Sequence, residues 1–163
     1  MAITKPRKSL PCRMQKLINL VDELASYIPQ LEARNEAVSA SSVGWQIEHS
    51  LLVISSVIEG VKRSDPSKYK WSFKPIKYLI FWRGKIPRGK SRAPKFVTPD
   101  TFTAESLLKH IDQCRAKVME LDSIGAGHYF SHPYFGDTKM KDVIPFLEMH
   151  TDHHLKIIKD ILQ

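Results

Sequence analysis

Cysteine is nearly absent from this chain. Cys12 and Cys114 are the only two in 163 residues, and they form no CxxC pair. No disulfide framework is expected, and both should be small apolar side chains in a reducing compartment. The chain also lacks any uncharged run approaching about 18 residues, and no apolar signal core follows its basic start. These absences predict a soluble, cytoplasmic protein without a membrane partner.

A pattern of alternating apolar and polar residues, typical of half-buried strands, is also lacking. Apolar residues instead recur at intervals of three and four, the period of a helix with one buried face. This periodicity predicts long helices at about 12–33, 42–63, 103–121 and 139–162. With 42% hydrophobic residues, residues 1–163 are expected to form one domain. The predicted fold class is all-α, a four-helix bundle.

A long crossover, residues 64–100, separates the second and third predicted helices and is rich in proline and glycine. Because proline interrupts helices, we expect only one short helix there, at about 76–82. From Lys62 to Lys95 there are twelve Lys and Arg against one acid, a balance of 12 − 1 = +11 in a chain of net charge +8. The crossover aromatics should be covered, because they carry much apolar surface. They are Trp71, Phe73, Tyr78, Phe81, Trp82 and Phe96.

Three histidines fall on apolar faces of the predicted helices. His150 and His154 lie one turn apart on the last helix, with Cβ atoms about 5–6 Å apart, a span that one divalent metal can bridge. His49 lies among apolar residues of the second helix, one turn after Trp45. The alternative for each is a histidine at the core edge, hydrogen-bonded to a carbonyl or to water. His110, on the edge of the third helix, is expected to be solvated.

The second predicted helix has two apolar faces and only a narrow polar strip. Ile47, Leu51, Ile54, Ile58 and Val61 line one face, and Trp45, Leu52 and Val53 lie with His49 on the other. A bundle covers only part of each helix. Either the crossover or a second subunit is therefore expected to cover the remainder.

Three motifs together resemble a known superfamily: WQIEH at 45–49, HPYFG at 132–136 and HTDHHL at 150–155. With the crossover segment RGKIPRGKSRAP, they look like an uncharacterised branch of the DinB-like, or YfiT-like, metal-binding four-helix bundles. The resemblance covers residues 12–162. It implies that His49, His150 and His154 bind one divalent metal ion, and it favours a homodimer.

The resemblance also implies a class of chemistry. Some members of that superfamily are thiol-dependent S-transferases or an isomerase, and others are labelled metal-dependent hydrolases. Both chemistries use a metal that lowers the pKa of bound water or thiol. Zinc or nickel is expected, although imidazoles also bind iron and manganese. No carboxylate base pairs with the three histidines, since Glu48, Glu148 and Asp152 point away from them.

Several further residues are candidates for the site. His153 lies beside the His150–His154 pair, and His132 and Tyr134 precede the last helix, so these three are candidate catalytic residues. For His132 and Tyr134, a structural role in a turn is at least as well supported. Trp45, Arg83 and Arg88 are candidates for substrate binding, and the two arginines favour an anionic small molecule or an acidic thiol. The alternative for the arginines is a solvated run of charge.

Two non-enzymatic alternatives remain open. One is a binding module for an acidic partner through the basic residues 62–95, where interleaved aromatics could serve phosphates and bases. No recognisable nucleic-acid motif accompanies that charge, so nucleic acid is not the expected partner. The other is a bundle used only for subunit association. The metal content of the purified protein would separate both from an enzyme.

Overall fold

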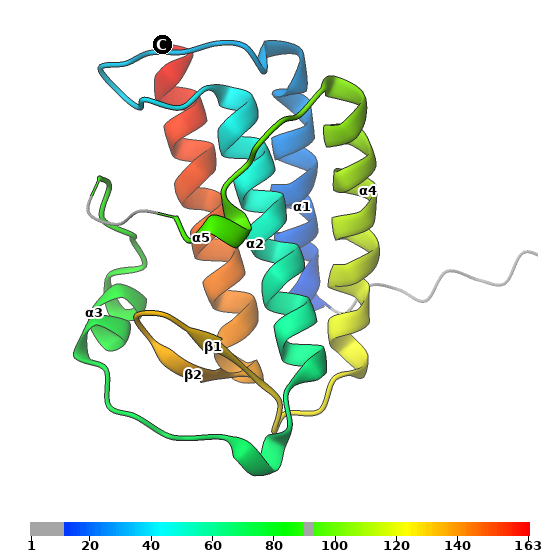
Figure 1. The fold of residues 1–163 in the computed structure, drawn as a ribbon, viewed down its shortest axis with the longest axis vertical. Coiled ribbons are helices and arrows are strands. Elements are labelled where there is room, and N and C mark those ends of the chain that lie inside the picture. The colour runs from blue at the N-terminus through cyan, green and yellow to red at the C-terminus, as the bar shows by residue number, and fades with distance from the viewer. Residues whose placement is uncertain (1–11, 90–92) are drawn as a thin grey trace, which may run out of the picture.

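The structure, a computed structural model, describes residues 12–89 and 93–163 and is mostly helical (Figure 1). Within these residues it contains five α-helices and one two-stranded antiparallel sheet. The helices are α1 (Cys12–Ser26), α2 (Val43–Arg63), α3 (Pro75–Arg83), α4 (Ala104–Glu120) and α5 (Met140–Ile161). The strands are β1 (Tyr129–His132) and β2 (Gly136–Lys139). No described helix is long and apolar enough to cross a membrane.

The predicted long helices are present, but the first ends earlier than expected. It was predicted to reach residue 33, whereas α1 ends at Ser26 and is followed by a 3-10 turn at Ile28–Gln30. Pro29 accounts for the early end, because it has no amide hydrogen and its ring clashes with the preceding turn. From the sequence, either Ser41 or Ser42 can cap α2, and either Thr101 or Thr103 can cap α4. In the structure Ser42 Oγ accepts from the Trp45 amide, and Thr103 Oγ1 accepts from the Ser106 amide.

The core lies between α1, α2, α4 and α5, which run side by side (Figure 1). α2 packs against α4 and α5, and α1 packs against the same two helices. The α2 face that carries Ile47, Leu51, Ile54 and Ile58 is covered inside the chain, since all four are 0% exposed. That face therefore needs no second subunit.

A β-hairpin, β1–β2, corrects the prediction that the chain contains helices alone. Its strands pair from Tyr129 with Lys139 to His132 with Gly136, and Gly136 adopts the positive φ of 66° that the turn requires. Ser131 Oγ donates to Asp137 at 2.6 Å, and the Met140 amide donates to the His128 carbonyl. The hairpin contacts α2 and α5. Strands of four residues are too short for alternation to be recognised in the sequence.

The crossover contains the predicted short helix, but its aromatic side chains are not covered. α3 matches the expected range of 76–82 within a residue at each end. Of the six crossover aromatics expected to be covered, Phe81 is partly buried, whereas Trp71, Phe73, Tyr78, Trp82 and Phe96 are exposed. The expectation that the crossover buries them is therefore wrong. Lys90 and Arg92 of the predicted basic segment, and the side chain of Cys12, lie outside what the structure describes, whereas Cys114 is buried.

A candidate metal centre between two helices

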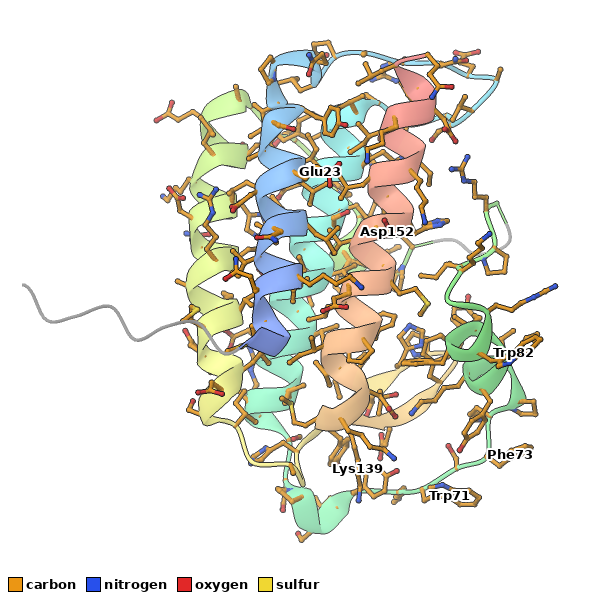
Figure 2. All side chains as sticks on the ribbon, turned by 180° about the vertical axis from the view of Figure 1, so that it is seen from behind. Glu23, Trp71, Phe73, Trp82, Lys139 and Asp152 are labelled. Atoms are coloured by element: carbon orange, nitrogen blue, oxygen red, sulfur yellow. The ribbon has the colours of Figure 1, made fainter. Side chains whose placement is uncertain are left out.

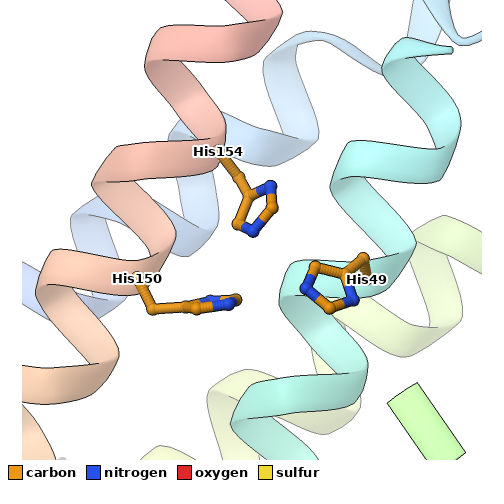
Figure 3. Close-up of side chains that lie close together, drawn as sticks. All are labelled: His49, His150 and His154. Atoms are coloured by element: carbon orange, nitrogen blue, oxygen red, sulfur yellow. The ribbon is translucent and has the colours of Figure 1, made fainter. Parts of the chain in front are cut away.

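Three histidines converge between α2 and α5. Figure 3 shows the rings of His49, His150 and His154 turned toward one another. One ligand nitrogen from each lies within 4.8 Å of the other two. The ring centroid of His49 is 5.2 Å from that of His150 and 4.7 Å from that of His154. The three side chains are therefore close enough to bind one metal ion.

The helices bring these residues together through simple geometry. His150 and His154 share one face of α5, because residues four positions apart lie one turn above each other. That face packs against α2, which contributes His49. His49 and His154 are 5% and 8% exposed, and His150 is half-buried. Trp45 stacks on His49, with ring centroids 4.9 Å apart and planes 13° apart.

Hydrogen bonds fix the tautomers of two of the histidines. His49 Nδ1 lies 2.7 Å from the Val97 carbonyl oxygen, which can only accept, so Nδ1 carries the hydrogen. His154 Nδ1 likewise donates to Gln46 Oε1 at 2.6 Å. In both rings Nε2 is left with its lone pair. Metal-binding histidines usually have this arrangement, in which the second nitrogen donates to a carbonyl or carboxylate.

His150 differs from the other two histidines in its hydrogen bonding. Its Nδ1 atom is buried and has no hydrogen-bond partner among the described residues. A buried polar atom without a partner costs about 1–3 kcal/mol. The donor set fits a divalent cation, since it offers three imidazoles of which two are already oriented and the third lacks another partner.

The electrostatics keep this cluster uncharged. Burial lowers the pKa of His49, although its bond to the Val97 carbonyl acts in the opposite direction. Burial, followed by the neighbouring histidines, holds the pKa values of His150 and His154 well below 6.5. Neutral imidazole is the form that binds metals. The cluster is therefore ready to coordinate a cation at neutral pH.

A pocket of about 260 Å³ lies beside the cluster, between α5 and the chain that follows α3. His153, Met149, Lys156 and Arg88 are among its lining residues. The ring of His153 lies 5.1 Å from that of His154, at 83° to it. Burial and the charges of Arg88 and Lys156 lower the pKa of His153 to about 4. The structure thus places two predicted candidates, His153 and Arg88, on one pocket, and His153 also contacts His154 of the cluster.

His132 and Tyr134 lie in the hairpin. His132 stacks on Phe135 at 4.1 Å, and its Nδ1 accepts hydrogen bonds from the amides of Tyr134 and Phe135. Burial and the charge of Lys77 lower the pKa of His132 to about 4. Of the two roles expected for His132, these contacts favour the structural one in the turn, and Tyr134 is exposed.

The two arginines proposed for substrate binding occupy different environments. Arg88 lines the pocket and forms an ion pair with Asp160 at 2.7 Å. Arg83, the last residue of α3, is exposed and is not among the residues that line the pocket. Both arginines are exposed, and what distinguishes them is that only Arg88 lines the pocket.

The sequence analysis did not identify two groups that orient the histidine cluster. Gln46 and the Val97 carbonyl orient His154 and His49, and the only sequence signal was a glutamine on the apolar part of α2.

His110 is not solvated as expected: its Nδ1 lies 3.0 Å from Glu48 Oε2, and its Nε2 lies 3.1 Å from Ser55 Oγ. Burial opposes a charge on this ring, but hydrogen bonds with Cys114 and Glu48 outweigh it and raise the pKa of His110 to about 9.

The arrangement is chemically that of an open three-histidine site. Structural zinc sites usually have four protein ligands, whereas three ligands leave a position for water or substrate. Carboxylates join histidines in many metal sites, but among the described residues this cluster consists of histidines alone. No protein-family model, curated protein or solved structure matches this chain.

Proposed function

We propose that this chain is a metal-dependent enzyme with a DinB-like four-helix bundle, in which His49, His150 and His154 hold one divalent ion. Zinc or nickel is the proposed ion. The observation that carries the proposal is the paired orientation of His49 and His154, whose Nδ1 atoms donate to Val97 and Gln46 while the other nitrogens remain available. A merely structural histidine pair would not need both rings to be held this way beside a third imidazole.

The proposed reaction is activation of water or of a low-molecular-weight thiol, as in a hydrolase or an S-transferase. When bound, the metal would lower the pKa of the coordinated nucleophile. The chain supplies three neutral ligands and, through Trp45 stacked on His49, an apolar wall beside the site. No protein carboxylate belongs to the cluster within the described residues, so the proposed nucleophile comes from solvent or from a second substrate.

The proposed substrate is a small anion held in the 260 Å³ pocket. Arg88, Lys85 and Lys156 give the pocket a positive lining, while Asp152 contributes one negative charge. Arg88 already binds the Asp160 carboxylate at 2.7 Å, which is the interaction that it would offer to a substrate carboxylate or phosphate. Because Arg83 lies outside the pocket, of the two arginines we assign substrate binding to Arg88.

Elemental analysis tests this proposal most directly. Protein purified without chelator should carry about one divalent ion per chain, as one three-histidine site requires. His150→Ala should lose the ion, and the neighbouring His153→Ala should keep it. Metal-loaded and chelated protein would then be compared on ester substrates and on electrophiles with low-molecular-weight thiols. Metal-free protein, or full retention of metal in His150→Ala, contradicts the proposal.

A further inference from the structure

Apolar side chains on the outer surface are concentrated in one short stretch of the crossover. Of the eleven large hydrophobic residues that are exposed in the described chain, six lie between residues 71 and 82. Trp82 is 82% exposed and Trp71 is 68% exposed. We call these six residues the aromatic platform: Trp71, Phe73, Ile76, Tyr78, Leu79 and Trp82. Two of them, Phe73 and Tyr78, stack with ring centroids 5.5 Å apart. Exposed apolar side chains that are concentrated in this way usually mark an interaction site.

Contacts on the inner side of α3 hold the aromatic platform in place. Ile80 is buried, and the ring of Phe81 lies 6.0 Å from that of Phe135 in the hairpin. Lys77 Nζ forms an ion pair with Asp142 at 2.8 Å, which ties α3 to α5. Figure 2 shows Trp71, Phe73 and Trp82 on the outer edge of this segment, away from the long helices. These contacts hold α3 against α5 and the hairpin, so its exposed side chains point outward from a fixed position.

Positive charge surrounds the aromatic platform. Residues 66–89 include seven Lys and Arg and no acidic residue. Lys70, Lys74, Arg83 and Lys85 are exposed. The charge continues across a pocket of about 200 Å³ next to Trp71 and Tyr78, which Lys139 and Lys141 also line. The two aspartates of that pocket are engaged: Asp137 accepts from Ser131 and from the Lys70 amide, and Asp142 pairs with Lys77.

We propose that the aromatic platform and its surrounding cations dock this protein on the surface of an anionic phospholipid bilayer. Tryptophan and tyrosine rings settle at the headgroup level of a bilayer, and lysine and arginine side chains reach the lipid phosphates from the same depth. α3 has nine residues, so it would lie in the interface rather than span the membrane. This inference replaces our sequence-based expectation that the chain has no membrane partner.

Two other occupants fit the surface less well. Single-stranded nucleic acid would stack its bases on aromatic rings, but Ile76 and Leu79, which are 43% and 45% exposed, offer no ring for stacking. In a symmetric dimer formed through this surface, the cations of one copy would face the cations of the other. Like charges brought into contact repel each other. An anionic bilayer fits better, because its apolar interior can bury the aliphatic side chains and its phosphates attract the surrounding cations.

Co-sedimentation of the full-length protein with lipid vesicles tests the proposal. We expect binding to vesicles in which a third of the phosphatidylcholine is replaced by phosphatidylserine, and little binding to pure phosphatidylcholine. Trp71→Ala with Trp82→Ala should abolish binding. Lys74→Glu, by reversing one charge, should weaken binding by at least about fivefold. Added salt should weaken it as well, because exposed charges are screened.

Matched controls come from α4, on the other side of the long helices from α3 (Figure 1). Leu108 is 53% exposed and Lys109 is exposed, so Leu108→Ala and Lys109→Glu should bind vesicles as the wild type does. Circular dichroism verifies that each variant is folded. The proposal is overturned by an absence of vesicle binding, by binding that the tryptophan variants retain, or by equal losses in the α4 controls. Capture of an oligo-dT strand in place of vesicles would overturn it in favour of nucleic acid.

Discussion

The Oε1 atom of Gln46 lies 2.6 Å from the Nδ1 atom of His154, so a buried amide on α2 determines which nitrogen of a histidine on α5 keeps its lone pair. The amide is itself oriented, because its Nε2 donates to Ser39 Oγ at 3.1 Å. Gln46 is therefore a positioning residue of the candidate metal centre, although it is not among the ligands.

Gln46→Leu is expected to weaken zinc binding by about 10–100-fold, the usual effect of removing a partner of a metal-binding histidine. Competition with a chromogenic chelator measures this affinity. Ser39→Ala removes the other hydrogen bond of the amide, together with the bond that Ser39 Oγ accepts from the Ser41 amide, and it leaves the contact with His154. It should therefore change affinity much less. Gln46→Glu retains an acceptor and should restore most of the binding. Equal affinities in wild type and Gln46→Leu would show that Gln46 only fills space.

Replacing Arg88 and replacing Arg83 should have different consequences. Arg88 lines the pocket beside His153 and Arg83 does not. We expect inorganic phosphate to raise the melting temperature of the metal-loaded wild type and of Arg83→Ala, but not that of Arg88→Ala. Both variants should keep their metal, because neither arginine is a ligand. Stabilisation of Arg88→Ala equal to that of the wild type would remove Arg88 from the proposed substrate site.

The His110–Glu48 pair should make stability depend on alkaline pH. The pKa of His110 is raised from 6.5 to about 9, so the pair stabilises the fold fully below pH 6.5 and stops doing so as pH rises through 9. Between about pH 5 and 6.5 the free energy of unfolding of the wild type should exceed that of Glu48→Gln by about 1 kcal/mol, since Glu48 supplies only part of the shift beside Cys114. This difference should vanish as the pH rises through 9. Urea unfolding across this pH range measures the difference. A difference that stays constant with pH would contradict the assignment.

Two glycines of α2 should respond oppositely to replacement by alanine. A Cβ atom at Gly44 would collide with the Phe102 ring and approach the Leu31 carbonyl oxygen at 3.0 Å. Gly44→Ala should therefore lower the free energy of unfolding by about 1–3 kcal/mol. At Gly60 the nearest atom is Phe130 Cβ at 3.6 Å, an ordinary contact, so Gly60→Ala should stabilise by about 0.5–1 kcal/mol through helix propensity. Thermal and urea unfolding measure both, and a stabilised Gly44→Ala would show that Phe102 moves aside freely.

Ile54→Asp should unfold the chain and not merely separate subunits. Ile54 is 0% exposed within a single chain, and an uncompensated buried charge costs about 3–5 kcal/mol. Circular dichroism should therefore show loss of helix together with any change of mass in light scattering. A folded, monomeric Ile54→Asp from a dimeric wild type would instead place this residue at a subunit interface, as the homodimer expected from the sequence would require.

The sequence predicted those features that depend on periodicity. Long helices were visible because each has to bury one face, and His49, His150 and His154 were visible because they interrupt those faces with polar rings. The caps were narrowed to Ser41 or Ser42 and to Thr101 or Thr103 because these residues precede apolar repeats, and the structure selects Ser42 and Thr103. In each case a short window of sequence contains the physical cause.

The remaining features depend on partners that are distant in the chain. Gln46 meets His154 across 108 positions, and Glu48 meets His110 across 62, so neither pair leaves a local pattern. The hairpin is short and held partly by polar contacts such as Ser131 with Asp137. The aromatic platform, on α3 and the residues before it, is an exception to the rule that aromatic residues are buried, which holds only on average.

The partner of His49 Nδ1 is a main-chain carbonyl, that of Val97, at the end of the crossover. A substitution at position 97 keeps a carbonyl group there, since every amino acid supplies one. A change in chain length between α2 and the 3-10 turn at Lys95–Val97 would shift the oxygen away from the ring. Deletions and insertions within residues 64–94 are thus expected to break the hydrogen bond between His49 and Val97 and to free the His49 ring to turn.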